Sequence, residues 1–134
     1  MNRSVMMYVL VLTVGASFGC TAIKKMKVGM ADNPYPDDPE SAIRGQAAYQ
    51  AHCVRCHGAD GRGNGPDAAT LTSRPLDLTS YASEKSANAA AMNISYGKNE
   101  MPPYIEILTN QEIWDVSNYV ISMGTPAEIK SAAP

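Results

Sequence analysis

Two cysteines and a histidine form the run Cys53-Val54-Arg55-Cys56-His57 near the middle of the chain. Positions three apart lie on one face of a helical turn, so the thiols of Cys53 and Cys56 can both reach one edge of a planar group. His57 follows directly and can approach the centre of that group from one side. This spacing is the attachment signature of a c-type haem, in which each thiol forms a thioether and the histidine binds the iron.

Zinc binding and dithiol redox chemistry are the alternatives for this run. A structural zinc site uses about four ligands, and His52 is the only further candidate close to the motif. A redox-active Cys-x-x-Cys pair belongs at the junction of a strand and a helix in an α/β chain, and no strand pattern precedes Cys53. Both alternatives stay open from the residues alone, but the spacing favours haem c as the cofactor.

The N-terminus indicates export from the cytoplasm. A short basic start is followed by an uncharged, largely apolar stretch from Val5 to Phe18, and then by Gly19 and Cys20. This outline is typical of an export signal, and residues 1–19 are interpreted as that signal. Export agrees with haem attachment, which is expected on the periplasmic side of a bacterial cytoplasmic membrane.

Three fates of this segment are compatible with the residues. Ser17-Phe18-Gly19-Cys20 resembles a bacterial lipobox, which predicts that Cys20 carries a lipid and anchors the protein to the membrane. Cleavage after a small residue such as Ala22 would instead release a soluble protein. The uncharged stretch from Val5 to Ile23 is also about long enough to remain as a spanning helix. Residues 20–38, rich in proline and aspartate, are expected to form an extended tether.

The charge balance argues against nucleic acid as a partner. The 134 residues carry 11 Lys and Arg against 13 Asp and Glu, a formal net charge of −2 at pH 7, whereas a nucleic-acid-binding surface needs a basic excess. After the ends are set aside, the length suffices for one domain. That domain is placed at residues 39–124, and residues 125–134 are expected to form a mobile tail.

Helical patterns predict an all-α domain with three main helices and long loops. The expected helices run from Pro39 to Cys53, from Glu84 to Ser95 and from Asn110 to Ser122, with a short turn around Ala68 to Leu71. Asp38 is a good N-cap for the first helix, Ser83 for the second and Thr109, in a capping box, for the third. Loops of this length are unusual in a compact domain, and one buried covalent haem accounts for them.

The first helix and the motif together resemble bacterial class I c-type cytochromes. The shared pattern is Gly45-x-x-x-Tyr49-x-x-x-Cys53-x-x-Cys56-His57-Gly58, and the likeness extends over about residues 38–123. The resemblance implies a mono-haem cytochrome c fold in which Gly45 and Tyr49 meet the C-terminal helix. It also implies that a proline carbonyl after the motif orients the histidine, so Pro66, in Gly65-Pro66, is the expected acceptor for His57.

A methionine in a proline-rich loop is the candidate for the second axial ligand. Met101-Pro102-Pro103-Tyr104 follows a Gly97-Lys98 turn and resembles the distal-ligand loop of bacterial class I cytochromes. A thioether is a soft ligand, and a His/Met pair raises the haem potential relative to two nitrogen ligands. Met92, within a predicted helix, is the competing methionine, and an open sixth position is the other alternative.

The function expected from these residues is electron transfer. Iron bound by both His57 and Met101 has no open position for a substrate, so we expect an electron carrier without turnover of its own that serves redox protein partners. A fixed haem subunit of a larger respiratory complex is the alternative, and the layout is similar to the mono-haem lipoprotein subunit of alternative complex III. Dissociation of Met101 to admit a small ligand is a third interpretation. Arg74 is a candidate to pair with a haem propionate, with an exposed surface role as its alternative.

Overall fold

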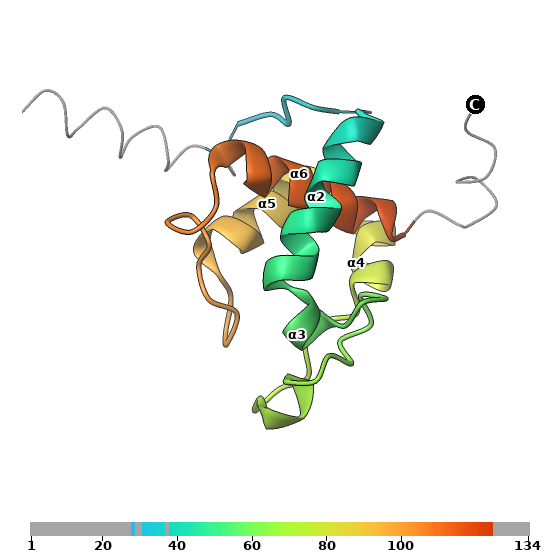
Figure 1. The fold of residues 1–134 in the computed structure, drawn as a ribbon, viewed down its shortest axis with the longest axis vertical. Coiled ribbons are helices and arrows are strands. Elements are labelled where there is room, and N and C mark those ends of the chain that lie inside the picture. The colour runs from blue at the N-terminus through green and yellow to red at the C-terminus, as the bar shows by residue number, and fades with distance from the viewer. Residues whose placement is uncertain (1–27, 29–30, 37, 125–134) are drawn as a thin grey trace, which may run out of the picture.

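The computed structural model describes residues 28, 31–36 and 38–124. Within that part of the chain the regular structure is helical, apart from one isolated bridge between Lys98 and Met101. The elements are, in order, α2 (Pro39–His52), α3 (Val54–His57), the 3₁₀ turn η2 (Ala68–Thr70), α4 (Leu78–Glu84), α5 (Ala87–Tyr96) and α6 (Asn110–Ser122). The predicted all-α class is therefore confirmed (Figure 1).

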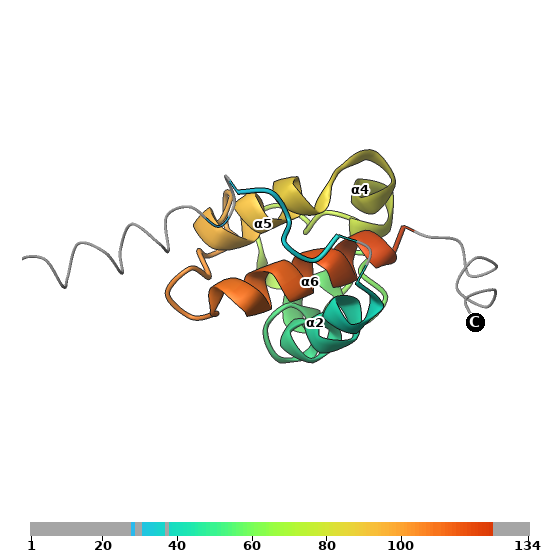
Figure 2. The same cartoon turned by 90° about the horizontal axis from the view of Figure 1, so that it is seen from above.

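The arrangement is centred on α6, which lies between α2 on one side and α4 and α5 on the other (Figure 2). Helices α2 and α6 touch at Gly45, where a Cβ atom would overlap the carbonyl oxygen of Asp115. Because glycine lacks that atom, the two backbones can meet directly. Further along α2, Tyr49 is fully buried and its ring centroid lies 5.2 Å from that of Tyr119. The contact expected from Gly45 and Tyr49 is present.

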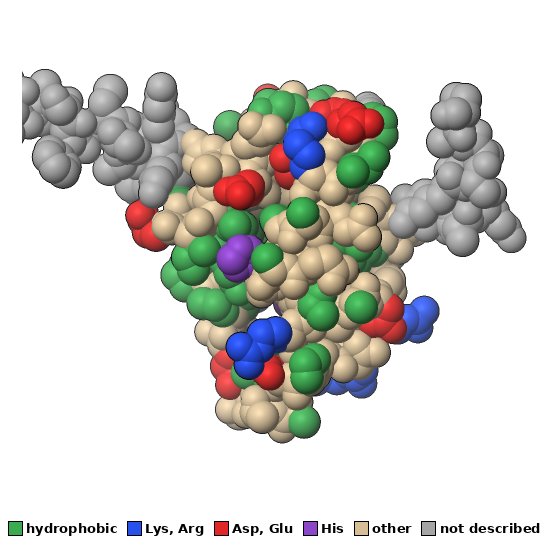
Figure 3. Space-filling view, viewed as in Figure 1, with side chains coloured by type: hydrophobic (Ala, Val, Ile, Leu, Met, Phe, Trp, Pro, Cys, Tyr) green, Lys and Arg blue, Asp and Glu red, His purple; other side chains and the backbone are tan. Residues whose placement is uncertain are grey.

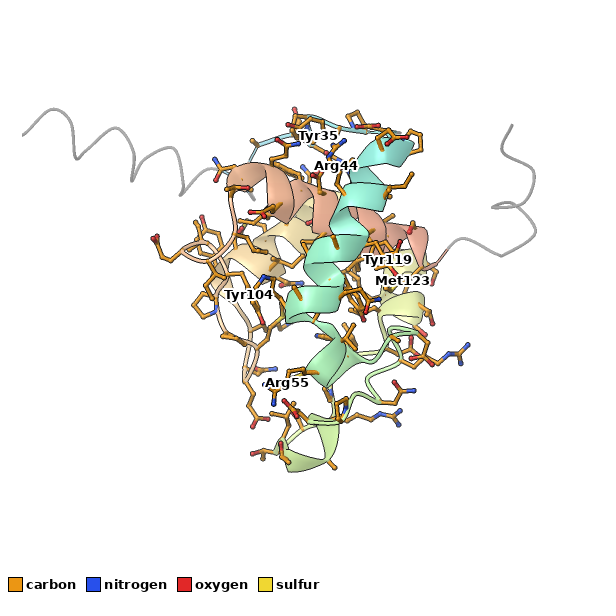
Figure 4. The ribbon with its side chains drawn as sticks, viewed as in Figure 1. Tyr35, Arg44, Arg55, Tyr104, Tyr119 and Met123 are labelled. Atoms are coloured by element: carbon orange, nitrogen blue, oxygen red, sulfur yellow. The ribbon has the colours of Figure 1, made fainter. Side chains whose placement is uncertain are left out.

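A buried carboxylate joins the same two helices. Asp115 is 3% exposed, and it accepts hydrogen bonds from the Ser41 hydroxyl at 2.6 Å and from the Arg44 guanidinium at 2.9 Å to each oxygen. A buried charge is tolerated when it is paired and hydrogen-bonded, and both partners here come from α2. The Arg44 guanidinium also lies 5.8 Å from the centroid of the Tyr35 ring (Figure 4), so the cluster includes the segment before α2.

The hydrophobic core is small and follows α5 and α6. Its buried apolar side chains are Val28, Tyr49, Leu78, Ala90, Ala91, Ile94, Leu108, Ile113, Trp114, Val116 and Val120. Cys53, Met101 and Tyr104 are partly buried against this cluster. The core therefore contacts both the attachment motif and the loop of Met101, the two segments in which the sequence predicts haem ligands.

The segment before α2 lies on the domain instead of extending away from it. Val28 is buried within the core cluster, with 4% of its surface exposed. Asn118 on α6 accepts a hydrogen bond from the Asn33 amide at 2.7 Å and donates one to the Tyr35 carbonyl at 3.1 Å. These contacts correct the expectation of an extended tether for residues 31–36, because the polar groups of this arm find partners on α6. Apart from Val28, the earlier part of the predicted tether lies outside the described residues.

The helix expected from Glu84 to Ser95 is present as α5, but it begins at Ala87, and α4 before it was not predicted. Asp77 caps α4 by accepting hydrogen bonds from backbone N–H groups of the following turn. Ser86, rather than Ser83, caps α5. Between the two helices Lys85 has an extended backbone, with φ −122° and ψ 161°, and this conformation interrupts the helical hydrogen bonding.

The first and last helices begin as predicted. Asp38 accepts a hydrogen bond from the Glu40 N–H at 3.0 Å at the start of α2. At the start of α6, Thr109 and Glu112 satisfy each other's backbone N–H groups in a complete capping box. Short polar residues at these positions therefore set both helix starts.

No helix within the described residues is long and apolar enough to cross a membrane. The predicted export signal at residues 1–19, Cys20 and the predicted tail at residues 125–134 lie outside the part of the chain that the structure describes. Their assignments stay predictions.

Candidate haem site

The motif forms a helical turn directly after α2. Cys53 is the C-cap of α2 and donates its N–H to the Tyr49 carbonyl at 2.9 Å. The N–H groups of Cys56 and His57 then donate to the carbonyl oxygen of Cys53 at 3.2 and 2.9 Å. Both cysteines are free thiols of intermediate exposure. The fold thus brings two thiols and an imidazole onto one turn, the arrangement that the spacing predicts.

Burial sets the protonation of these side chains. It raises the pKa of the Cys53 thiol to about 12, with a smaller contribution from Cys56, so this thiol is protonated at neutral pH. Burial also lowers the pKa of His57, against the opposing effect of its hydrogen bond with the backbone of Leu76. A neutral imidazole is the form that binds a metal, and the environment of His57 favours it.

The carbonyl that orients His57 belongs to Leu76, which corrects the expectation for Pro66. The Nδ1 atom of His57 lies 3.2 Å from the Leu76 carbonyl oxygen. With the proton on Nδ1 the ring donates to that oxygen, and Nε2 is free to bind metal. Pro66 is exposed, and the N–H groups on either side of it donate to carbonyl groups of α3 at 3.1 and 2.8 Å. The turn from Gly65 to Asp67 therefore packs along α3. The chain comes within hydrogen-bond distance of the His57 imidazole only at Leu76.

The glycines after the motif fold the chain back against α3. Gly58, Gly61 and Gly63 have φ values of 79°, 76° and 68°, which glycine adopts without strain. The N–H of Gly63 donates to the His57 carbonyl at 2.8 Å. The buried Tyr49 hydroxyl donates to the Gly58 carbonyl at 2.7 Å. A hydrogen bond from Tyr49 on α2 and one from Gly63 within the loop therefore hold the backbone next to His57.

The loop that carries Met101 is closed by its own turn and held by α5. Lys98 and Met101 exchange both backbone hydrogen bonds, at 3.1 and 3.0 Å, with Asn99 at a φ of 54°. Beyond the two prolines, the Tyr104 N–H donates to the Ile94 carbonyl at 3.0 Å. The Met101 side chain is partly buried against the core cluster. A soft sulfur that is shielded from water is suited to a second axial position.

The competing Met92 lies elsewhere in the fold, as do Met123 and the nearby His52. Met92 on α5 is 38% exposed. Met123 packs against Gly61 and lies across α2 from Tyr104, the last residue of the Met-Pro-Pro-Tyr run (Figure 4). His52 is exposed, and its ring centroid lies 6.0 Å from that of Tyr104, which agrees with a surface histidine. The geometry favours Met101, and its bond to iron stays a prediction.

Arg74 braces the glycine-rich loop. It is exposed and donates to the carbonyl oxygens of Gly63 at 3.3 Å and Arg62 at 3.2 Å. These contacts give Arg74 a structural role that the sequence did not indicate. Its pairing with a haem propionate stays a prediction.

Glu100 also links two loops, although no pattern in the sequence marks it. Its carboxylate accepts hydrogen bonds from the backbone N–H groups of Thr72 and Ser73, both at 3.1 Å. These bonds lower the pKa of Glu100. Its partners are backbone groups 28 and 27 residues away, so no side-chain pattern could have revealed the pairing.

A protein-family model described as cytochrome c matches residues 42–124, which include the motif, Met101 and α6. The chain belongs to the cytochrome c family. This cytochrome therefore carries covalently attached haem c, with Cys53 and Cys56 in the attachment motif. The cytochrome c domain supports electron transfer by a haem protein, and the predicted cytochrome c fold is confirmed.

Curated relatives include both a small cytochrome and longer enzymes. The chain is 32% identical over 90 residues to a cytochrome c6-like protein of Nostoc sp., covering 64% of this chain and 74% of the relative. It is 33% identical over 86 residues to thiosulfate dehydrogenase of Allochromatium vinosum, covering 63% of this chain. The match spans only 32% of that enzyme's length.

Two solved structures share the fold. A chain of the reducing HAO-like protein complex of Kuenenia stuttgartiensis aligns with a TM-score of 0.61 at 27% identity, covering 69% of this chain and 47% of that one. A second c-type cytochrome aligns with a TM-score of 0.52 at 25% identity, covering 60% of this chain and 98% of its own. The same domain thus occurs both as most of a small protein and as part of a larger one.

The residues of this cytochrome fit the haem that its family implies. Two free thiols lie on one turn, and the imidazole beside them has one nitrogen hydrogen-bonded and the other free. The space-filling view shows an opening into the lower half of the molecule, at the level of α3 in Figure 1 (Figure 3). A bound haem iron supplies reversible exchange of one electron. Cys53, Cys56 and His57 would hold it from one side, and Met101 as the ligand on the other side stays a prediction.

Proposed function

We propose that this cytochrome carries single electrons between redox proteins on the periplasmic side of a bacterial membrane, with His57 and Met101 as the axial ligands of one haem. The proposal is carried by the hydrogen-bonded imidazole of His57 on α3, and the partly buried thioether of Met101 in a closed loop supports it. Iron bound on both sides has no open position, so one-electron exchange is the chemistry left to it. The likeness to cytochrome c6-like proteins supports a carrier that does not turn over a substrate.

The proposal includes export and attachment to a membrane. The apolar stretch before Cys20 supports export, and a lipid on Cys20 is the favoured anchor, with a retained helix or a released soluble form as the alternatives. The residues from Cys20 to Val28 span at most roughly 30 Å when fully extended. Because Val28 is already buried in the domain, a lipid on Cys20 would hold the cytochrome close to the membrane surface.

Optical spectroscopy of the exported, haem-loaded protein tests the axial ligands. We expect a low-spin spectrum with the weak far-red methionine–iron band and no change when the reduced protein is exposed to carbon monoxide. Met101→Ala should remove that band and admit carbon monoxide. Met92→Ala is the matched control, because Met92 is exposed on α5, and it should behave as the wild type. Carbon monoxide binding by the wild type would show that Met101 is not a firm ligand and would favour the ligand-binding interpretation.

A haem subunit of a larger assembly is the second candidate. The alignment with a chain of the reducing HAO-like complex and the greater length of the thiosulfate dehydrogenases support it, and the similarity to the subunit of alternative complex III belongs with this candidate. Purification from native membranes in mild detergent separates the two, because a subunit would retain partners in fixed ratio. Reduction of the isolated protein by thiosulfate would instead indicate an enzymatic role.

A further inference from the structure

We propose that Glu100 is a positioning residue that keeps Met101 on the haem iron by fastening its loop to the 72–76 strap, the segment from Thr72 to Leu76. The inference rests on the proposed function, because it takes Met101 as the axial ligand. It adds a residue outside the ligand set on which the strength of that bond depends.

The contact between Glu100 and the strap uses both carboxylate oxygens. Oε1 accepts from the N–H of Thr72 and Oε2 from the N–H of Ser73, each at 3.1 Å, and Oε2 also lies 3.4 Å from the Ser73 hydroxyl. Hydrogen bonds to an ionised group are stronger than those between neutral groups. Two of them at once also fix the direction of the side chain, and therefore of the backbone that carries it.

Glu100 and Met101 are adjacent residues of one hydrogen-bonded turn, so we expect their backbones to move together. Both residues belong to the turn that Lys98 closes through two hydrogen bonds with Met101. On its other side the loop is fastened to α5, through the N–H groups of Tyr104 and Ile105. Glu100 supplies the fastening on the side that these contacts leave open, so its loss should loosen Met101 without unfolding the loop.

The strap that receives Glu100 also holds the proximal ligand. Leu76 at its end provides the carbonyl oxygen near Nδ1 of His57. Arg74 in its middle donates to the carbonyl oxygens of Arg62 and Gly63, which anchors the strap to the glycine-rich loop. One short segment therefore connects the supports of both axial ligands.

Displacement of Met101 by added imidazole tests the proposal. The far-red band of the oxidised, haem-loaded protein would be titrated with imidazole for the wild type, Glu100→Ala and Glu100→Gln. Loss of two charge-assisted hydrogen bonds at an exposed site should raise the apparent imidazole affinity of Glu100→Ala about tenfold. Glu100→Gln keeps an acceptor without the charge, so it should give an intermediate value.

Glu84→Ala is the matched control. Glu84 is exposed at the end of α4 and takes no part in the contacts of the strap, so this variant removes the same charge and should keep the wild-type affinity for imidazole. Haem content and far-ultraviolet circular dichroism of Glu100→Ala should also match the wild type. Such a result would separate a loosened ligand from a damaged fold.

The outcomes distinguish this inference from the proposed function. A wild-type protein that shows the methionine band, together with a Glu100→Ala variant of unchanged imidazole affinity, would overturn the role of Glu100 alone. An equal increase in Glu84→Ala would also overturn it, because the effect would then be one of net charge. A wild-type protein without the band would overturn Met101 ligation and the inference with it.

Discussion

Gly45 is the residue on which the approach of α2 to α6 depends, because a Cβ there would overlap backbone atoms of Asp115 and Val116. Overpacking typically costs about 1–3 kcal/mol, and backbone atoms have little freedom to yield. The gain in helix propensity from glycine to alanine is at most ~1 kcal/mol, so overpacking wins. We expect Gly45→Ala to lower the free energy of unfolding by about 2 kcal/mol, measured by denaturant titration of the haem-loaded protein.

Gln46→Ala serves as the comparison for that variant. Gln46 is exposed on the same helix, and an exposed substitution should change the free energy of unfolding by no more than about 0.5 kcal/mol. If Gly45→Ala were as stable as Gln46→Ala, the two helices could not meet as closely as they do in the structure.

The residues that the sequence revealed were those whose type alone indicates their role. The spacing of Cys53, Cys56 and His57 carries its chemistry in the residue types, and Gly45 is informative because it lacks a side chain. Leu76 was missed because it acts through a carbonyl group, which every residue has. Glu100 acts through its own carboxylate, but it was missed because both of its firm partners are backbone N–H groups, which leave no mark in the residue types.

Among the helices, α6 has the most complete N-terminal cap. Thr109 accepts from the N–H of Glu112 at 3.2 Å, and Glu112 accepts from the N–H of Thr109 at 2.8 Å. Removing an N-cap hydroxyl typically costs about 1 kcal/mol. We therefore expect Thr109→Ala to lower the free energy of unfolding by about that amount at neutral pH. Gln111→Ala, at an exposed position in the same turn, should leave it nearly unchanged.

The cost of Thr109→Ala should also depend on pH. Hydrogen bonds from the backbone N–H and the hydroxyl of Thr109 lower the pKa of Glu112. A lowered carboxyl pKa means that the folded state favours the ionised form, so its contribution is complete above the ordinary value of 4.5 and is lost as the pH falls through the lower folded value. Unfolding curves on both sides of this range should show the difference between variant and wild type shrinking in acid. A constant difference would assign the whole effect to the hydroxyl cap.

Helices with a cap directly before an apolar pattern were predicted well, whereas α4 and the start of α5 were not. Either Ser83 or Ser86 could begin a helix by its residue type. The choice follows from packing, because Leu78 is buried and donates its N–H to the Gly61 carbonyl at 2.7 Å. That contact places Ser83 within α4 and leaves Ser86 to begin the next helix. It involves residues too far apart in sequence for a local pattern.

At the scale of the whole molecule, the buried apolar side chains alone give little packing to stabilise the long loops. Several large apolar side chains are exposed: Ile43, Leu76, Met92, Tyr96 and Ile107. We expect a Cys53→Ala/Cys56→Ala variant, which cannot attach haem covalently, to lose the near-ultraviolet circular dichroism and the cooperative thermal transition of the haem-loaded protein. Met101→Ala, which keeps both cysteines, should retain a cooperative transition. A cooperative transition in the double variant would mean that the helices pack stably on their own.

The packing of the N-terminal arm, residues 31–36, on α6 has a consequence for how a redox partner could be positioned. Helix α2 begins directly after the arm and ends at the attachment motif, and its 14 residues form a strut about 21 Å long. Gly45 and the Asp115 cluster fix this helix on α6 independently of the arm. A partner protein that binds the arm would therefore hold the redox centre at a set distance from its own surface, about the length of α2.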